Sequence, residues 1–381
     1  MELEIQNRPT WAEIDLDKMA FNFHSVKEFV GDKIKYMAVV KADAYGHGAV
    51  KCSRRLEKEG IDWFGVALPT EGVELRENGI RKRILCLGGF WEGEEKLLLN
   101  NHLTPVIYQI EQAEKLNEAA KNRNLRVEIH VKIDTGMGRI GVRFDEVPEF
   151  AGKLKNFENL HLEGLMTHFA SANDLDENDF TKLQIKRFDN SLQTFINKGF
   201  DPIYKNLANS PASVAHPESY GNMVRLGGII YGLGDDVLPQ EIDLPKYKAV
   251  LSLFTKIAHI KKVKQGETLG YSRMFRTERD SIIATIPIGY QDGYSRSLSN
   301  KGKVIINGKF APIVGRISMD WTILDVTDIV NVKIGDKVIL IGKENNLEIR
   351  SSDLAGLTDT ISYEITCRIN RRVEKIYVES E

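Results

Sequence analysis

A lysine at the end of an apolar run is the residue of this sequence with the clearest chemical potential. Residues 36–40 (YMAVV) carry no charge and lead directly into Lys41, which opens a turn rich in Asp, Tyr and Gly. An apolar strand without alternation is covered on both faces, as in a parallel sheet. A lysine at its carboxyl end is partly desolvated, so the pKa of its amine falls and the neutral amine can form a Schiff base. The alternative is an ordinary solvated lysine at a strand terminus.

The elements that must position this lysine repeat along the first 235 residues. Polar, mostly helix-like stretches, including 111–121 and 182–197, separate eight apolar strands. Eight strands in βα alternation predict a TIM barrel that closes near residue 235, whereas a doubly wound sheet is the competing architecture. The strands are expected around Val39, Val66, Leu85, Val106, Val131, Leu165, Leu207 and Val224.

Polar residues at the ends of the later strands favour the barrel. TIM-barrel enzymes carry their chemistry where the carboxyl ends of the strands meet, and phosphate sites often follow strands seven and eight. Paired glycines let backbone N–H groups approach a phosphate, and a serine adds a hydroxyl donor. Each residue alone is more simply a core or turn residue, but together they indicate a site. They are Lys132, Asp134 and Arg139 after the fifth strand, His168 after the sixth, Asn209 and Ser210 after the seventh, and Arg225, Gly227 and Gly228 at the eighth.

The pattern changes from helical to β-rich near Pro239. Asn307-Gly308 is a strong hairpin signal, and one helix is expected at 352–367 before a last strand at 372–378. At the other end, a strand at 10–14 precedes a helix that Asp17 can cap. We therefore expect an N-terminal strand (1–12) that joins the C-terminal domain, a barrel (13–240) and a β-rich domain (241–381). Its strands are expected at 250–260, 282–288, 303–306, 323–326 and 337–341.

Composition narrows the classes of partner. The chain has 381 residues, a net charge of -2 and a sequence pI near 6.5, so neither nucleic acid nor a membrane is expected as a partner. The start has acidic residues and no apolar leader segment, and no apolar run approaches the roughly 20 residues of a membrane span. A cytoplasmic protein is predicted. Cys52, Cys86 and Cys367 lack metal-ligand spacing, so they are expected as free buried thiols without a metal.

Several motifs resemble those of one enzyme family. VVKADAYGHG around Lys41 resembles the pyridoxal-phosphate lysine motif of alanine racemases. The segments LGYSRMF, IGYQDGYSR, GRISMDWTILDVTD and TISYEITCRI resemble later parts of the same family, in the expected order from Arg8 to Val378. The resemblance implies a homodimer that binds pyridoxal 5'-phosphate and interconverts L-alanine and D-alanine, supplying D-alanine for peptidoglycan.

The resemblance also implies residue roles. Lys41 would carry the cofactor and act as one base, and Tyr271 from the second subunit would act as the other. Racemisation needs two acid/base groups on opposite sides of the substrate, or one that can reach both, because the α-proton leaves one face and returns on the other. The implied cofactor-binding residues are Lys41, Tyr45, His168, Asn209, Ser210, Arg225, Gly227, Gly228 and Tyr363. Arg139 and the Met319 N–H would bind the substrate carboxylate, and Tyr290, Arg296, Arg316 and Asn173 would line the substrate's route.

Alternatives stay open both for the state of Lys132 and for the function of the protein. Lys132 is either carbamylated by CO₂, which would fix Arg139, or paired with Asp134. Arg225, always protonated, would leave the pyridine nitrogen of the cofactor largely neutral, which disfavours a decarboxylase. The rival functions are a racemase acting on serine, lysine or a broad range, and a barrel that binds the cofactor without turnover. Asn173, Trp321 and Gly228 depart from the usual family pattern and bear on substrate range.

Overall fold

The computed structural model describes residues 8–380, and its N-terminal half is a nearly closed barrel. Parallel neighbours run in the order β10-β2-β3-β4-β5-β6-β8-β9, with the short β7 (Val142–Arg143) beside β6. The two edge strands, β9 and β10, are joined by hydrogen bonds from Arg225 N–H to the Ala208 oxygen (2.9 Å) and from Asn222 N–H to the Lys205 oxygen (3.2 Å). The predicted TIM barrel is confirmed. Its strands are β2 (Lys35–Val39), β3 (Trp63–Val66), β4 (Arg83–Cys86), β5 (Thr104–Ile107), β6 (Val127–Asp134), β8 (Leu160–Met166), β9 (Tyr204–Asn206) and β10 (Met223–Leu226).

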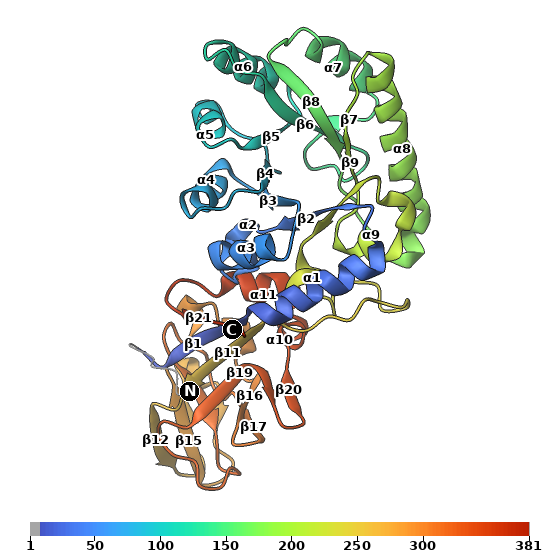
Figure 1. Ribbon diagram of the computed structural model, residues 1–381. Coiled ribbons are helices and arrows are strands. Elements are labelled where there is room, and N and C mark those ends of the chain that lie inside the picture. The colour runs from blue at the N-terminus through green and yellow to red at the C-terminus, as the bar shows by residue number, and fades with distance from the viewer. Residues whose placement is uncertain (1–7, 381) are drawn as a thin grey trace.

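Helices cover the outside of the barrel (Figure 1). The two predicted helices are found, although α8 begins four residues before the expected start. The predicted cap of α1 was wrong: Asp15, still extended at the end of β1, accepts the Lys18 N–H at 2.9 Å, while Asp17 lies within the helix. The helices are α1 (Leu16–Val30), α3 (Ala49–Lys58), α4 (Pro69–Glu77), α5 (Glu95–Asn100), α6 (Ile110–Lys121), α7 (Val147–Leu154), α8 (Asn178–Asn197) and α9 (Ser210–Ala215).

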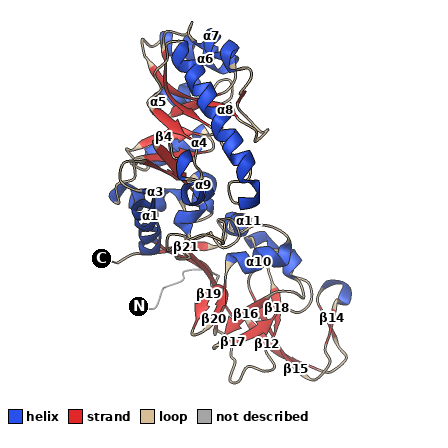
Figure 2. Ribbon diagram, turned by 90° about the vertical axis from the view of Figure 1, so that its right-hand side faces the viewer, coloured by secondary structure: helices blue, strands red, loops and turns tan. Residues whose placement is uncertain are grey.

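The C-terminal half is a separate β-rich body below the barrel (Figure 2). Its main sheet has the order β17-β16-β19-β11-β1-β21, with β20 beside β19, and β12-β15-β18 and β13-β14 form two smaller sheets. The Asn307-Gly308 hairpin joins β16 to β17 as predicted, with both residues at positive φ. The strands are β11 (Leu251–Lys256), β12 (His259–Val263), β13 (Thr268–Leu269), β14 (Phe275–Arg276), β15 (Ser281–Ile286), β16 (Lys303–Ile306), β17 (Lys309–Pro312), β18 (Thr322–Asp325), β19 (Lys337–Glu344), β20 (Leu347–Ile349) and β21 (Glu374–Val378).

Two predicted elements of this half are each broken in two. The expected strand 250–260 is β11 followed by β12, because Ile257 N–H bonds the Asp336 oxygen and Ala258 N–H bonds the Thr285 oxygen, so the chain crosses between sheets. The expected helix 352–367 is α10 (Ser351–Thr358) and α11 (Ser362–Arg368), because Asp359 adopts a left-handed conformation between them. Short 3₁₀ turns complete the structure: η1 (Leu175–Glu177), η2 (Pro217–Ser219), η3 (Gly228–Tyr231), η4 (Tyr271–Arg273), η5 (Tyr290–Asp292) and η6 (Arg296–Leu298).

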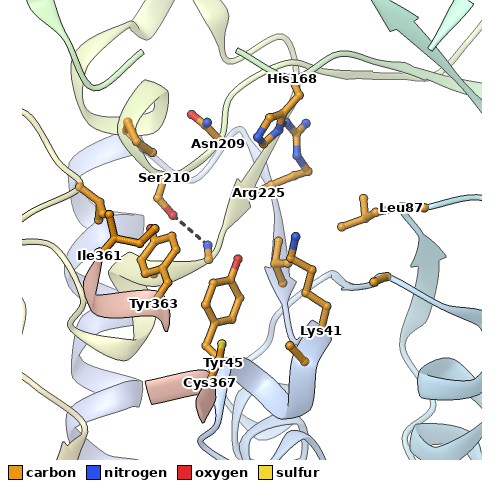
Figure 3. A pocket seen from close by; sticks show the side chains of 18 of the residues that line it. Lys41, Tyr45, Leu87, His168, Asn209, Ser210, Arg225, Ile361, Tyr363 and Cys367 are labelled. Carbon is orange, nitrogen blue, oxygen red and sulfur yellow. Dashed lines mark hydrogen bonds between the residues drawn. The ribbon is translucent and has the colours of Figure 1, made fainter. Parts of the chain in front are cut away.

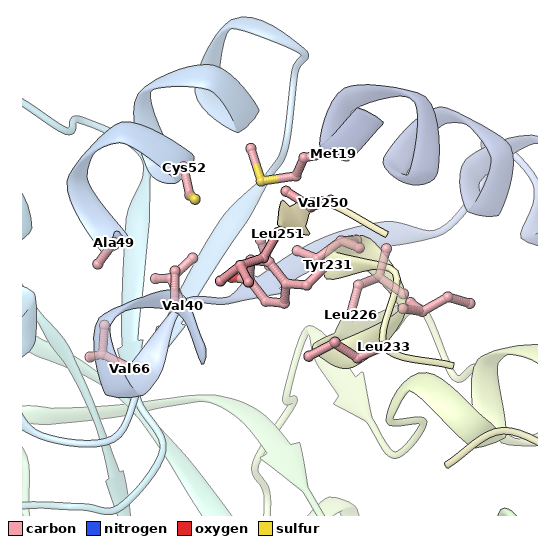
Figure 4. Packing of buried hydrophobic residues seen from close by; sticks show 14 of the residues in the cluster. Met19, Val40, Ala49, Cys52, Val66, Leu226, Tyr231, Leu233, Val250 and Leu251 are labelled. Atoms are coloured by element: carbon pink, nitrogen blue, oxygen red, sulfur yellow. The ribbon is translucent and has the colours of Figure 1, made fainter. Parts of the chain in front are cut away.

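The first strand ties the two halves together. β1 (Thr10–Asp15) lies between β11 and β21, pairing Ala12 with Leu253 on one side and with Lys375 on the other. Residues 1–7 of the predicted segment 1–12 lie outside the described residues. Tyr231 packs near Met19 of α1 and Leu251 of β11, and its hydroxyl donates to the Val39 oxygen at 2.9 Å (Figure 4). The chain after the barrel therefore packs directly behind the strand that ends at Lys41.

The three cysteines differ in environment. Cys52 and Cys86 are buried, but Cys367 is exposed, so the prediction of three buried thiols was wrong for Cys367. Cys367 lies on α11 beside the cavity described below, rather than in the core. Within residues 8–380, no cluster of His, Cys, Asp or Glu side chains is arranged to hold a metal ion. No helix in that range is long and apolar enough to cross a membrane.

Candidate active site

A cavity of about 780 Å³ lies at the carboxyl ends of the barrel strands (Figure 3). α11 of the C-terminal domain closes one side of it with Tyr363 and Cys367. Sequence reasoning missed Cys367, although the helix expected at 352–367 already places it one turn after Tyr363. It also missed Leu87, which follows the end of β4. The cavity brings together most of the predicted site: Lys41, Tyr45, Lys132, Arg139, His168, Asn173, Asn209, Ser210, Arg225, Gly227, Gly228 and Tyr363.

The turn after Lys41 has an unusual backbone. In α2 (Lys41–Tyr45), the residues from Ala42 to Tyr45 have φ between 53° and 55°, a left-handed turn without glycine. Such a conformation costs roughly 1–2 kcal/mol per residue, so surrounding contacts must hold it. Ala42 N–H donates to Glu71 Oε1 at 2.7 Å, and Asp43 accepts the Ala49 N–H at 2.7 Å. The turn presents both Lys41 and Tyr45 to the cavity (Figure 3).

The glycines of this motif allow the C-terminal domain to approach. A Cβ atom at Gly46 would collide with the Thr366 carbonyl oxygen of α11, and one at Gly48 would collide with the Tyr377 hydroxyl of β21. Both glycines have positive φ. Asp43 also pairs with Lys375 of β21. The lysine turn is therefore clamped between the barrel and the last elements of the chain.

Two glycines and two phenols shape a cradle that fits a phosphate. Gly227 N–H donates to Ser210 Oγ at 2.8 Å, and a Cβ at Gly227 would lie 2.8 Å from the Tyr45 hydroxyl. A Cβ at Gly228 would collide with the Tyr363 ring. Burial raises the pKa of both phenols, which therefore remain hydrogen-bond donors at neutral pH. Donors around a space that only glycine leaves open suit a bound phosphate group.

Asn209 has a structural task beside this cradle. Its side-chain oxygen accepts the Ala212 N–H at 3.1 Å, so Asn209 caps α9. The same cap places Ser210 as the first residue of the helix, where its hydroxyl meets Gly227. Asn209 lines the cavity, but this oxygen is already engaged.

Arg225 is fixed by buried acceptors. Its Nη atoms donate to the carbonyl oxygens of Asn206 (3.0 Å), Thr167 (2.9 Å) and Leu207 (3.0 Å), and Nη2 lies 3.2 Å from His168 Nδ1. Burial lowers the pKa of Arg225 to about 10, which still leaves it protonated at neutral pH. Within residues 8–380 its Nε has no hydrogen-bond partner. Arg225 thus gives the cavity a positive charge and one N–H group, at Nε, that can donate a hydrogen bond to a bound molecule.

Positive charge dominates the cavity and weakens its other bases. Burial, then Arg139, lowers the pKa of Lys41. Burial, then Arg225, lowers the pKa of Lys132 to about 7 and that of His168 well below its usual value. His168 is therefore neutral at pH 7, and each lysine has an enlarged neutral fraction. Such a cavity attracts anions and supplies neutral amines.

Of the two alternatives for Lys132, the ion pair with Asp134 is not formed. Asp134 Oδ1 instead accepts the N–H groups of Gly136 and Gly138, each at 3.0 Å, and Oδ2 lies 3.5 Å from Arg143 Nη1. These bonds close the glycine-rich loop that carries Arg139 to the cavity wall. Lys132 makes neither an ion pair nor a side-chain hydrogen bond with any residue in the described part of the chain.

A second group of predicted residues lies outside the cavity, in the C-terminal domain. Tyr271 is 70% exposed and Met319 is 50% exposed. Tyr271 and Arg316 line a separate hollow of about 420 Å³. His168 and Arg225, two of the residues predicted for the site, are in contact, but Tyr271 lies in that other hollow and does not line the cavity. Tyr290 and Arg296 are also exposed residues of the C-terminal domain.

The exposed loops are nevertheless well held. Tyr290 N–H donates to the Ser318 oxygen at 3.0 Å, and Gln291 N–H donates to the Met319 oxygen at 3.1 Å, so the two loops are bonded together. Asp292, whose side chain is fully buried, bonds Arg8 at 2.8 Å. It also accepts the Gly289 N–H at 3.0 Å. The loops of Tyr290 and Met319 are thus fixed to each other at the surface of the C-terminal domain.

The fold and the cavity define a class: barrel enzymes that offer a lysine amine beside a phosphate cradle, with a β-domain behind. Comparison with known proteins gives the family. The profile "Alanine racemase, N-terminal domain" matches residues 14–235, and "Alanine racemase, C-terminal domain" matches residues 250–377. The chain belongs to the alanine racemase family, and as such it is an enzyme that interconverts L-alanine and D-alanine.

Individual relatives agree with this assignment over nearly the whole chain. The chain is 42% identical to the alanine racemase of Geobacter sp. (strain M21), covering 98% of this chain and 100% of that protein. The alanine racemase structure from Clostridium difficile 630 has a TM-score of 0.91 at 38% identity, covering 98% and 96%. The Bartonella henselae alanine racemase, which contains covalently bound pyridoxal phosphate, has a TM-score of 0.87 at 29% identity, covering 98% and 100%. The family depends on pyridoxal phosphate.

Proposed function

We propose that the barrel cavity binds pyridoxal 5'-phosphate and that Lys41 is the residue bonded to it. The main support is that Lys41 lines the same cavity as the residues of the phosphate cradle, which are Tyr45, Ser210, Gly227 and Tyr363. The bound cofactor supplies an electron-withdrawing system that makes the α-proton of an attached amino acid acidic. Every other part of the reaction depends on how the side chains of this protein hold the substrate and move protons.

Lys41 acts as the base on one face of the substrate. Its pKa is lowered by burial and by Arg139, so its Nζ is more readily neutral and can accept the α-proton at neutral pH. Arg225 would hold the pyridine nitrogen of the bound cofactor, and its Nε–H would be the donor. Since its guanidinium stays protonated and is held by three carbonyl oxygens, it donates a hydrogen bond without giving up its proton. This restrains electron withdrawal and favours return of the proton over side reactions.

Lys132 is modified by CO₂ to a carbamate. The alternative, an ion pair with Asp134, is not formed, because Asp134 accepts hydrogen bonds from N–H groups of its own loop. A pKa of about 7 gives Lys132 a large neutral fraction, which is the form that reacts with CO₂. The resulting anion would be offset by the surrounding cations and would fix Arg139, the group that binds the substrate carboxylate.

Tyr271 is the second base, and it serves the cavity of a partner subunit in a homodimer. This is supported by its separation from the cavity of its own chain and by its 70% exposure. The Met319 N–H, also exposed on the C-terminal domain, reaches the substrate carboxylate in the same way, and Tyr290, Arg296, Arg316 and Asn173 line the route. A monomer would then be inactive, so dilution below the dimer dissociation constant should abolish racemisation. Full activity in a demonstrated monomer contradicts this proposal.

Alanine is the preferred substrate, and its D-enantiomer is destined for peptidoglycan. The test is incubation of cofactor-loaded protein in D₂O with L-alanine, L-serine or L-lysine, followed by chiral separation and mass analysis. D-alanine with deuterium at the α-carbon should form much faster than product from the others. Faster turnover of serine or lysine would assign the protein to a broader racemase and direct attention to Asn173 and Trp321. Absence of exchange on all three would favour a binding protein.

A further inference from the structure

Glu71 is the residue that holds the start of the left-handed turn. Ala42 is the first left-handed residue after Lys41, and its N–H donates to Glu71 Oε1 at 2.7 Å. The other carboxylate oxygen accepts the N–H groups of Ala67 at 2.7 Å and Leu68 at 3.1 Å, at the start of α4. One carboxylate therefore joins the residue after Lys41 to the start of the helix that follows β3.

Only an ionised carboxylate satisfies this arrangement. All three partners of Glu71 are backbone donors, and they approach both of its oxygens. A carboxylate accepts at both ends, whereas an amide would place an NH₂ group against an N–H group on one side. The negative charge of Glu71 also raises the pKa of Lys41, against the larger effect of burial. Glu71 thus affects both the backbone beside Lys41 and its electrostatic environment.

Other anchors of the turn act farther from Lys41. Asp43 bonds Ala49 and Lys375, beyond the middle of the turn, and Gly46 contacts α11 after the turn has ended. In the described part of the chain, Glu71 is the side chain that bonds the backbone adjacent to Lys41. Loss of the Asp43 contacts would loosen the end of the turn, but loss of the Glu71 contact would free its start.

We propose that Glu71 is a positioning residue for Lys41. By fixing the backbone from which the lysine side chain begins, it sets the direction in which Nζ enters the cavity. This inference rests on the proposed role of Lys41 as cofactor-bonded base. It makes the base that moves the proton dependent on a residue of α4 that does not line the cavity.

The test compares Glu71→Gln with Glu74→Gln. Glu74 is the matched control, because it lies one turn later on α4 and lines the same small hollow beneath the turn. Its side chain makes no hydrogen bond within residues 8–380. In the cofactor-loaded dimer, Glu71→Gln should lower kcat for L-alanine about tenfold while KM changes less than about twofold, because the carboxylate-binding groups are untouched. Glu74→Gln should match the wild type in both constants.

Two further readouts do not depend on turnover. In cofactor-free protein, amide hydrogen exchange should speed up in peptide 41–48 of Glu71→Gln, with the rest of the barrel unchanged. The pH at which the absorption band of the bound cofactor changes should shift downward, since a negative charge near Lys41 is lost. Glu74→Gln should show neither effect. Both readouts remain interpretable even if alanine is not the substrate.

A shorter acid separates the two ends of the contact. Glu71→Asp keeps the charge and can bond the start of α4, but one methylene less prevents it from also reaching Ala42. It should restore thermal stability without restoring kcat or the slow exchange of peptide 41–48. Restoration of all three by Asp would overturn the proposal, as would Glu71→Gln behaving like Glu74→Gln. Faster exchange throughout the barrel would also overturn it, because Glu71 would then only cap α4.

Discussion

The barrel cavity and the loops around Tyr271 differ in how completely one chain builds them. Within the barrel, Arg225 is fully buried and bonded to three carbonyl oxygens, and the lysine turn is clamped from two sides. In the C-terminal domain, the backbone is equally well held, yet Tyr271 and Met319 expose most or half of their surface. This difference is what the proposed homodimer requires, because an exposed Tyr271 can act only on a cavity that another chain brings to it.

The contrast teaches that order and completeness are separate properties of a site. Burial in the barrel gives most polar groups a partner within the same chain, as the hydrogen bonds of Arg225 and Asp134 show. Asp292 and its arginines fix the exposed loops without giving Tyr271 anything to act on. The comparison predicts that damage to the cavity stays with its own subunit, whereas damage to the loops is felt by the neighbour.

Subunit mixing gives the largest expected effect. Lys41→Ala and Tyr271→Phe homodimers should each be nearly inactive, because every site lacks one base. After the two variants are mixed and allowed to exchange subunits, half of the sites in the mixed dimers combine an intact Lys41 with an intact Tyr271. Activity should then rise from near zero to about a quarter of the wild-type value. Steady-state racemisation before and after exchange measures it.

A cis arrangement predicts a different outcome for the same mixture. If Tyr271 served the cavity of its own chain, every site would keep one defect and mixing would restore nothing. Mixing each variant with more of itself is the matched control for the handling steps. A Tyr271→Phe homodimer with full activity would remove Tyr271 from the chemistry altogether.

Arg225→Lys should give the largest loss of stability. A lysine ammonium cannot reproduce the fork that satisfies the carbonyl oxygens of Asn206, Thr167 and Leu207, so at least one buried acceptor is left unpaired. We expect a loss of about 3 kcal/mol in unfolding free energy by denaturant titration. Arg143→Lys is the control, because the Arg143 side chain is 47% exposed and its contact with Asp134 Oδ2 is long, at 3.5 Å. Its loss should stay within about 0.5 kcal/mol.

Lys132 should make stability depend on pH. Its pKa of about 7 in the folded chain lies below the ordinary lysine pKa of 10.5, so the unfolded chain binds more protons between these values. Stability should therefore rise with pH in this window, by about 2 kcal/mol from about pH 7 to about pH 9 in CO₂-free buffer. Lys132→Met should lose this increment. Thermal unfolding of both cofactor-free proteins measures the difference.

Bicarbonate distinguishes the amine from its carbamate. If Lys132 reacts with CO₂, adding bicarbonate should raise the stability of the wild type, because the carbamate forms on the folded chain, and it should leave Lys132→Met unaffected. With ¹³C-labelled bicarbonate, a carbamate carbon signal should be present in the wild type and missing in the variant. A wild-type stability unchanged by bicarbonate, with no carbon signal, would rule out the modification.

Most of the barrel could be predicted from the sequence, because the signals for its strands and helices are local. Apolar residues marked most of the eight strands, although β9 is Tyr-Lys-Asn and ends before the expected centre at Leu207. The polar residues at the strand ends, such as His168 and Arg225, do meet in one cavity. What failed were boundaries set by distant partners. The break after β11 depends on bonds from Ile257 to Asp336 and from Ala258 to Thr285, and the sequence around residue 257 contains no sign of either.

The special geometry of the site was equally hidden. The left-handed turn after Lys41 consists of ordinary residues, and its stabilising contacts come from Glu71 and Lys375, far along the chain. The sequence also left two alternatives open for Lys132, and it could not show that Asp134 is already bonded to backbone N–H groups of the following loop. Local patterns therefore located the site, while its strain and its pairing depended on the tertiary structure.

Asp292→Asn should have the smallest effect and should act on substrate binding. Asp292 links Arg8, Arg372 and the Gly289 N–H, and this keeps the Tyr290 loop against the Met319 loop. An asparagine keeps the shape but loses the charge, and both arginines are partly exposed and can rehydrate. We expect KM for alanine to rise about threefold with kcat nearly constant, because the Met319 N–H shifts while both bases stay in place.

The effect should also cross the subunit boundary, which ties it to the comparison. In a mixed dimer with Lys41→Ala, the functional cavity belongs to the subunit that has Lys41, while its loops come from the other chain. Placing Asp292→Asn on the Lys41→Ala chain should therefore raise KM of the working site, and placing it on the chain with intact Lys41 should leave KM unchanged. Equal KM values for the two placements would mean that the Tyr290 and Met319 loops do not serve the neighbouring cavity.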